Sequence, residues 1–202
     1  MPQWTCLELL ITSICNRKCQ ECCYRIPAHT TLEPKHYSWD IFERAAEAFN
    51  GISKLYVSGG EATLHPDFEK ISKEFKSLFN TKNMILVSNG YNILKYQKSL
   101  EYFDYIWITD FKDEYSANSI RWVEDNYKDK LMLAQAKHIP LNKKGGGKKC
   151  SRYGLMASAN DKAFPCCIGP GLISAPFATV EPLCVEKIKL LEAPCSTCAF
   201  SV

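Results

Sequence analysis

The sequence predicts an α/β fold in which the strands of the main sheet run parallel. Short apolar runs rich in branched and aromatic residues recur along the first two thirds of the chain. Amphipathic helical patterns separate several of these runs. Alternation of this kind implies parallel strands joined by right-handed crossovers.

Five segments have the composition of strands, namely residues 7–14, 54–58, 83–88, 104–110 and 130–136. A first helix is predicted where apolar residues recur at helical spacing, at Trp39, Phe42, Ala46 and Phe49. Ser38 suits its N-cap and Gly51 its end. Pro66 is expected to begin a second helix, whose apolar stripe comprises Phe68, Ile71, Phe75 and Leu78.

Composition narrows the class of protein. The chain of 202 residues is 46% hydrophobic and 23% charged, which is typical of a globular protein, and no apolar run is long enough to cross a bilayer. The first residues lack the pattern of a secretory signal, so a reducing cytoplasm is expected. The net charge of +3 is too small to indicate a nucleic-acid partner. Eleven cysteines in a reducing compartment indicate metal rather than disulfides.

In parallel α/β sheets, ligands bind at the loops that follow the strands. Here those loops read "CNRKCQECCY", "GGEATLHPD", "SNGY" and "DFKDEYS". Cys15, Cys19 and Cys22 in the first loop form C-x3-C-x2-C, with Cys23 as an alternative third ligand. Three thiolates on one loop can hold one metal centre and leave a coordination position open.

These motifs resemble the radical S-adenosylmethionine (radical SAM) superfamily. The resemblance is carried by the cysteine triad after the first strand, "GGEAT" at 59–63 after the second and "SNG" at 88–90 after the third. It implies a partial (β/α)6-type TIM barrel. It also implies that Cys15, Cys19 and Cys22 ligate a [4Fe-4S] cluster whose fourth iron binds SAM.

The resemblance also assigns residues to SAM. Gly59, Gly60 and Glu61 would hold its amino group, since glycine permits close backbone approach and a carboxylate pairs with an ammonium. Ser88 and Asn89 would face the ribose hydroxyls, although the same tripeptide also suits a plain turn. The family has an aromatic residue before the third cysteine, where this chain has Glu21, and Tyr24 is the candidate to contact the adenine.

The last sixty residues differ from the rest and predict a small cysteine-rich subdomain. The cluster "NKKGGGKK" at 142–149 marks the boundary, which gives a core at 1–140 and a subdomain at 141–202. Two short strands are expected around the turn Asn160-Asp161. The tail resembles the twitch type of SPASM domain, which implies an auxiliary [4Fe-4S] cluster on Cys150, Cys166, Cys195 and Cys198, with Cys167 as an alternative to Cys166.

Zinc is the main alternative for the tail, because C-x-x-C is also half of a zinc ribbon site. A redox pair of Cys195 and Cys198 is a further alternative. Cys6, Cys23, Cys167 and Cys184 are otherwise expected to be structural thiols. A non-catalytic zinc or iron-sulfur binding module therefore stands beside the enzyme hypothesis.

The resemblance implies a radical SAM oxidoreductase. It would cleave SAM to a 5'-deoxyadenosyl radical, remove hydrogen from a small-molecule substrate and pass the remaining electron to the auxiliary cluster, with flavodoxin or ferredoxin as the electron donor. Asp110 and Lys112 after the fourth strand, and Gln135 after the fifth, are candidates to contact substrate or SAM. Modification of a peptide or nucleic-acid-linked group is the alternative, for which the lysines at 143, 144, 148 and 149 give a weak indication.

Overall fold

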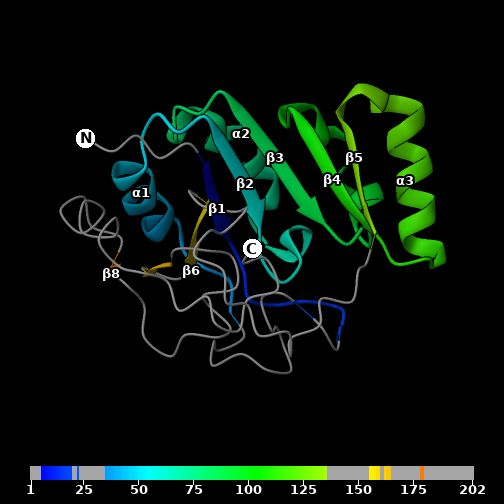
Figure 1. The fold of residues 1–202 in the computed structure, drawn as a ribbon, viewed down its shortest axis with the longest axis horizontal. Helices are drawn as coiled ribbons and strands as arrows, with labels where there is room; N and C mark the ends of the chain where they lie inside the picture. The colour runs from blue at the N-terminus through cyan, green and yellow to red at the C-terminus, as the bar shows by residue number, and fades with distance from the viewer. Residues whose placement is uncertain are drawn as a thin grey trace, which may run out of the picture.

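A mixed sheet with six parallel strands organises the molecule (Figure 1). The computed structural model describes residues 6–19, 22, 35–135, 155–159, 162–164 and 178–179. The strand order is β5-β4-β3-β2-β1-β6-β7-β8, and only β7 and β8 pair antiparallel to their neighbours. The strands are β1 Cys6–Leu10, β2 Lys54–Ser58, β3 Asn83–Ser88, β4 Tyr105–Asp110, β5 Leu131–Gln135, β6 Leu155–Ala159, β7 Lys162–Phe164 and β8 Ala178–Thr179.

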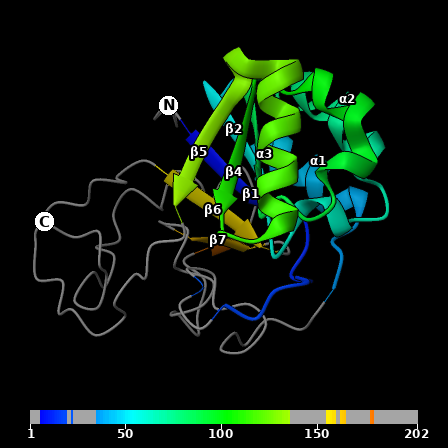
Figure 2. The ribbon, with the colours of Figure 1, turned by 90° about the vertical axis from the view of Figure 1, so that its right-hand side faces the viewer.

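The three α-helices of the described part of the chain lie on one face of this sheet (Figure 2). They are α1 Trp39–Ala48, α2 Phe68–Leu78 and α3 Glu114–Tyr127. Among the described residues, the connections also contain three 3-10 helices, namely η1 Ala62–Leu64, η2 Ile93–Tyr102 and η3 Lys128–Lys130. The predicted α/β class with a parallel sheet is confirmed.

The core lies between the sheet and the helices. Paired positions in β1 to β5 carry a row of apolar side chains across the sheet. They are Leu9, Val57, Leu86, Ile106 and Leu131. Phenylalanines from α1 and α2, among them Phe42, Phe68 and Phe75, are buried against the strands. Removing this apolar surface from water holds the sheet in register, because a shift by one residue would turn every row to the other face.

The first strand is shorter than the sequence predicted. The 7–14 run is apolar as far as Ile14, yet β1 ends at Leu10. Beyond it the backbone bonds to other segments: Thr12 pairs with His36, and the carbonyl oxygens of Thr12 and Ile14 accept from the loop after β2. The end of the apolar run is therefore buried loop rather than strand.

The helices agree with the sequence in part. Ser38 is the N-cap residue of α1 and Gly51 follows the helix with φ at +76°, as expected. Pro66 does not begin α2, because η1 precedes it and α2 starts at Phe68 with Asp67 as its N-cap residue. Neither α3 nor η2 was assigned from the sequence. The buried face of α3 carries Ser116, Ser119 and Val123, so its apolar stripe is weak.

The hairpin around Asn160 and Asp161 is confirmed for its strands, since β6 and β7 pair antiparallel with Ala159 opposite Lys162. Its first strand also pairs parallel with β1 and thereby extends the main sheet. The boundary at residues 140 and 141 lies outside the described residues and stays a prediction.

His65 links η1 to α2 and gives the fold a predicted pH dependence. The ring is 1% exposed, Nε2 bonds the Tyr37 carbonyl oxygen at 2.9 Å, and Nδ1 accepts from the Asp67 amide at 3.1 Å. This arrangement requires the neutral ring, and burial lowers the pKa of His65 from 6.5.

The unfolded chain therefore binds more protons than the folded one near pH 6.5, so stability is present above that pH and falls as pH drops below it. We expect urea unfolding between pH 8 and pH 5 to show this fall, and His65→Asn to flatten it. An unchanged pH dependence in His65→Asn would contradict the assignment. Burial also lowers the pKa of His36, so His36→Asn is measured alongside to separate the contribution of His36 from that of His65.

Candidate active site

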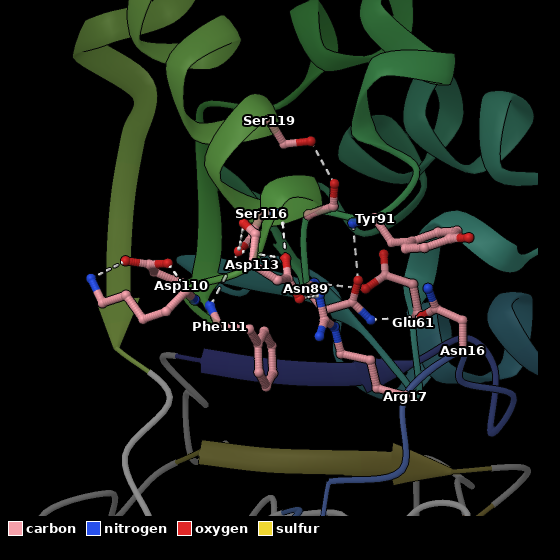
Figure 3. Close-up of polar contacts among 12 residues, drawn as sticks. Asn16, Arg17, Glu61, Asn89, Tyr91, Asp110, Phe111, Asp113, Ser116 and Ser119 are labelled. Atoms are coloured by element: carbon pink, nitrogen blue, oxygen red, sulfur yellow. Dashed lines mark hydrogen bonds and ion pairs between the residues drawn. The ribbon is translucent and has the colours of Figure 1, made fainter.

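Four loops gather at the carboxyl edge of the parallel strands, as the sequence predicted (Figure 3). The cysteine loop follows β1, residues 59–61 follow β2, residues 89–91 follow β3 and residues 111–113 follow β4. Asn16, Arg17, Glu61, Asn89 and Asp113 from these loops point toward a common region in Figure 3. The loops are tied to one another by side-chain hydrogen bonds and by backbone bonds.

The cysteine loop brings three thiols close enough for Cys19 and Cys22 to affect the pKa of Cys15. Burial raises the pKa of Cys15 to about 11, an amide from Arg17 opposes this, and Glu61, Cys22 and Cys19 raise it further. Burial and the neighbouring Cys22 likewise raise the pKa of Cys19. Without added positive charge these groups are thiols at neutral pH, whereas a bound metal centre stabilises them as thiolates.

Cys15 receives hydrogen bonds from two nitrogen donors. The Arg17 amide lies 3.4 Å from Cys15 Sγ, and Asn89 Nδ2 lies 3.9 Å from it. Hydrogen bonds to the sulfur ligands of an iron-sulfur cluster help to set its reduction potential. The surroundings of Cys15 therefore suit a cluster ligand.

Gly59 and Gly60 press the loop after β2 against the cysteine loop. The amides of Gly60 and Glu61 donate to the carbonyl oxygens of Thr12 (2.8 Å) and Ile14 (2.9 Å). A Cβ on Gly60 would lie 2.2 Å from the Ile14 oxygen, and one on Gly59 would lie 2.5 Å from the Thr12 oxygen. The close approach that these glycines permit is thus to the chain's own backbone, immediately before Cys15.

Glu61 is a buried carboxylate that joins two of the loops. Its Oε1 accepts from the amide and hydroxyl of Thr63 (3.2 and 2.6 Å) and from Ser88 Oγ (2.8 Å). Its Oε2 accepts from the Asn89 amide at 2.7 Å. Burial raises the pKa of Glu61, while these donors act in the opposite direction. The side chain is 1% exposed, so it fixes the loop after β3 relative to the loop after β2.

Ser88 and Asn89 are both engaged with the protein. Ser88 Oγ donates to Glu61 and accepts from the Gly90 amide at 3.0 Å. Asn89 Nδ2 donates to Asn16 Oδ1 at 2.8 Å, and Asn89 Oδ1 accepts from the Tyr91 amide at 3.0 Å. Asn89 therefore connects the loop after β3 to the cysteine loop (Figure 3).

Asp110 and Lys112 form a local pair at the end of β4. Asp110 Oδ1 accepts from the Lys112 amide at 2.9 Å, and the Lys112 ammonium contacts Asp110 Oδ2. These bonds lower the pKa of Asp110. Lys112 has φ at +61° and its side chain is 74% exposed, so it reaches into solvent from this edge. Gln135 ends β5 opposite Asp110 in register, and its side chain lies outside the described set.

Several residues of the site were not singled out from the sequence. Asn16 and Arg17 lie between the cysteines, and Asp113 is the N-cap residue of α3, where its side chain accepts from the Ser116 amide at 2.9 Å. Asp is a favoured N-cap residue, but without α3 there was no helix to assign it to. Tyr91 and Tyr115 form an exposed ring pair with centroids 4.7 Å apart.

The remaining predicted residues lie outside the described residues. They are Tyr24, Cys150, Cys166, Cys195 and Cys198. Among the residues that are described, no three His, Cys, Asp or Glu side chains converge to hold a single metal ion. Within the same part of the chain, no helix is long and apolar enough to span a membrane.

Fold and site together define an α/β protein with a cysteine loop and polar loops at the carboxyl edge of a parallel sheet. Residues 9–108 match the family model described as the radical SAM superfamily. Residues 9–108 of the chain therefore form a radical SAM domain.

Known proteins resemble part of the chain in sequence. The mitochondrial GTP 3',8-cyclase of Arabidopsis thaliana is 32% identical over 93 residues, which are 45% of this chain and 24% of that protein. The GTP 3',8-cyclase of Actinobacillus pleuropneumoniae serotype 3 (strain JL03) is 30% identical over 113 residues, which are 54% of this chain and 32% of that protein. The chain thus spans about a third or less of the length of these relatives.

In three dimensions the chain is similar to BtrN in complex with AdoMet and 2-DOIA. The TM-score is 0.68 at 15% sequence identity, and the match covers 92% of this chain and 81% of BtrN. An open conformation of BtrN matches with a TM-score of 0.61 at 13% identity, over 93% of this chain and 85% of that one. At this level of identity the similarity concerns the fold, and it confirms the partial barrel expected from the sequence.

The superfamily implies a [4Fe-4S] cluster and SAM, and the residues present fit the cluster. Each cysteine of such a site binds a different iron, so the three thiols need to share a neighbourhood rather than one ion. Cys15, Cys19 and Cys22 share it, and two N–H groups are directed at Cys15 Sγ.

Proposed function

We propose that this protein is a radical SAM enzyme that binds its cluster through Cys15, Cys19 and Cys22 and oxidises a small molecule. The observation that carries the proposal is the neighbourhood of these three thiols on the loop after β1, within the radical SAM domain. When bound, the cluster and SAM supply a 5'-deoxyadenosyl radical that removes hydrogen from a substrate carbon.

The polar loops would bind and orient SAM beside the cysteine loop. Glu61 Oε2 accepts a single hydrogen bond, so it retains an acceptor position for the amino group of SAM next to Gly59 and Gly60. Ser88 and Asn89 would lie along the ribose, with the Ser88 hydroxyl and the Asn89 backbone amide held by Glu61. Tyr24 is proposed to contact the adenine.

Asp110, Lys112 and Gln135 would contact substrate at the ends of β4 and β5. The exposed Lys112 ammonium and its Asp110 partner offer one cation and one anion at this edge, which suits a polar substrate. Cys150, Cys166, Cys195 and Cys198 are proposed to hold an auxiliary [4Fe-4S] cluster that accepts the substrate electron. A flavodoxin or ferredoxin in the cytoplasm would supply the first electron.

A second candidate is radical chemistry on a purine nucleotide. It is favoured by the two relatives named above, which are GTP 3',8-cyclases 30–32% identical to this chain over 93 and 113 residues. The two candidates share the cysteine loop and differ in what binds above it.

Release of 5'-deoxyadenosine from SAM tests the shared step. Anaerobically reconstituted and reduced protein is expected to release it, and Cys19→Ala to abolish the release, because a cluster site with two cysteines loses its iron. Mass spectrometry of the quenched reaction measures the product. GTP is added as the candidate nucleotide, and a small polyhydroxylated amine, such as an aminocyclitol, as the candidate small molecule. Faster release with one of the two separates the candidates.

Cys6→Ala is the matched control, since Cys6 lies at the start of β1, away from the carboxyl edge. It is expected to keep the activity. Cys198→Ala should spare SAM cleavage more than product formation if the tail holds an electron-accepting cluster. Equal activity of Cys19→Ala and Cys6→Ala would refute the assignment of the cysteine loop.

A further inference from the structure

Arg17 connects the cysteine loop to the start of α3 over 96 residues of sequence (Figure 3). Its backbone amide is one of the two donors to Cys15 Sγ, so any displacement of Arg17 displaces the environment of that thiol. Its side chain leaves the loop and reaches Asp113, with Nη2 2.5 Å from Oδ2. The guanidinium carbon also lies 4.1 Å from the centre of the Phe111 ring. Arg17 thus bonds to the Cys15 sulfur and also contacts Phe111 and Asp113 in the loop after β4.

Asp113 is itself held in place. Its Oδ1 accepts from the amide and the hydroxyl of Ser116, both at 2.9 Å, as the N-cap of α3. Its other oxygen is left for Arg17, so the helix cap and the ion pair use different atoms. The position of the Arg17 guanidinium is therefore fixed to the first turn of a 14-residue helix rather than to a free loop.

Both side chains of this ion pair are less exposed than those of the pair between Arg44 and Asp40. The Arg17 and Asp113 side chains are 18% and 34% exposed, whereas those of Arg44 and Asp40 on α1 are 45% and 61% exposed. Shelter from water and salt strengthens an ion pair, and stacking on Phe111 adds a cation–π contribution. The Arg17 contact should consequently restrain the cysteine loop, whereas the Arg44 contact has little effect.

We propose that Arg17 is a positioning residue for the cluster: its ion pair with Asp113 latches the cysteine loop to α3 and slows the loss of iron. The proposal rests on the proposed function, because it assumes that the loop holds a cluster. Other ties to the loop remain when the latch is removed, namely the Asn16–Asn89 bond and the backbone bonds from Gly60 and Glu61. Loss of the latch should therefore loosen the site without unfolding the protein.

The test measures how fast a ferrous chelator removes iron from anaerobically reconstituted full-length protein. Arg17→Met removes the charge and keeps an apolar chain against Phe111, and Asp113→Asn keeps the N-cap and removes the carboxylate charge. We expect both to release iron roughly 10-fold faster than the wild type, in the range seen when residues behind metal ligands are changed. Arg17→Lys, which keeps a cation in reach of Asp113, should recover part of the loss.

Asp40→Asn is the matched control, because it breaks an ion pair at the start of α1 and should leave the rate unchanged. The urea midpoint and the electron paramagnetic resonance spectrum of each reduced variant are recorded in parallel. Wild-type rates in Arg17→Met and Asp113→Asn would overturn the latch. A urea midpoint that falls together with iron retention would also overturn the proposal. The ion pair would then stabilise the whole fold rather than the cysteine loop. A wild type that binds no iron would instead refute the proposed function.

Discussion

Gly60→Ala is expected to destabilise the protein by about 3 kcal/mol or more and to abolish iron binding. The new Cβ would lie 2.2 Å from the Ile14 oxygen and 2.9 Å from the Cys15 nitrogen. Both are backbone atoms of the cysteine loop, so no side-chain rotation can relieve the overlap. The loop after β2 would have to separate from the segment that carries Cys15. Urea unfolding and iron content after reconstitution measure the two effects.

Gly51→Ala is the matched control for this prediction. Gly51 also has a constrained backbone, with φ at +76°, but nothing lies within 4 Å of an added Cβ. Its replacement should cost about 1–2 kcal/mol from the left-handed conformation alone and leave iron binding intact. If Gly60→Ala retained full iron and the stability of Gly51→Ala, the close packing of the two loops would not matter for the site.

Glu61→Gln is expected to cost on the order of 3 kcal/mol, because an amide cannot replace the buried carboxylate. The carboxylate accepts from four donors, and the Gln Nε2 group would face at least one of them as a donor. The hydrogen bond that this change affects most is the one from the Asn89 amide to Oε2 of residue 61. The loop after β3 would then lose its fixed position beside the cysteine loop.

Equilibrium unfolding, together with hydrogen exchange at the Asn89 amide, measures this effect. The amide should exchange faster in Glu61→Gln than in the wild type. Glu69→Gln, an exposed position on α2, is the control and should change the free energy of unfolding by less than about 0.5 kcal/mol. Unchanged protection of the Asn89 amide in Glu61→Gln would contradict the role of Glu61 as the tie between the loops.

The architecture of the sheet was predictable because its signal is local. The predicted strands at 54–58 and 83–88 have the same bounds as β2 and β3. Each is an apolar run that ends at a polar residue. Buried parallel strands are apolar on both faces, so the composition of a short run is sufficient. The predicted first strand extended too far for the same reason, since residues 11–13 are buried without belonging to β1.

The parallel contact between β1 and β6 had no such local signal. About 145 residues separate these strands, and which strand lies beside which is decided by packing rather than by composition. Helix α3 was missed because its buried side chains include Ser116 and Ser119, which periodicity does not count as apolar.

The candidate site was predictable in location and less so in the roles of its residues. Spacing identified the cysteine loop and the Gly-Gly-Glu segment. It did not indicate that Glu61 is bonded to Thr63, Ser88 and Asn89, because a carboxylate in a loop has the same appearance whether it faces a ligand or the protein. Arg17 likewise appeared as a charged loop residue, and its partner 96 positions away belonged to an unassigned helix.

The most direct test of the account is the electron paramagnetic resonance spectrum of the reduced, anaerobic protein before and after SAM is added. Subtracting the spectrum of Cys19→Ala isolates the centre bound by the cysteine loop from any second cluster. The account predicts that chemical analysis of the wild type and Cys19→Ala differs by about four irons and four sulfides per chain, and that the difference spectrum shifts when SAM binds. A difference spectrum that SAM leaves unchanged, or a loop that binds zinc without sulfide, would contradict it.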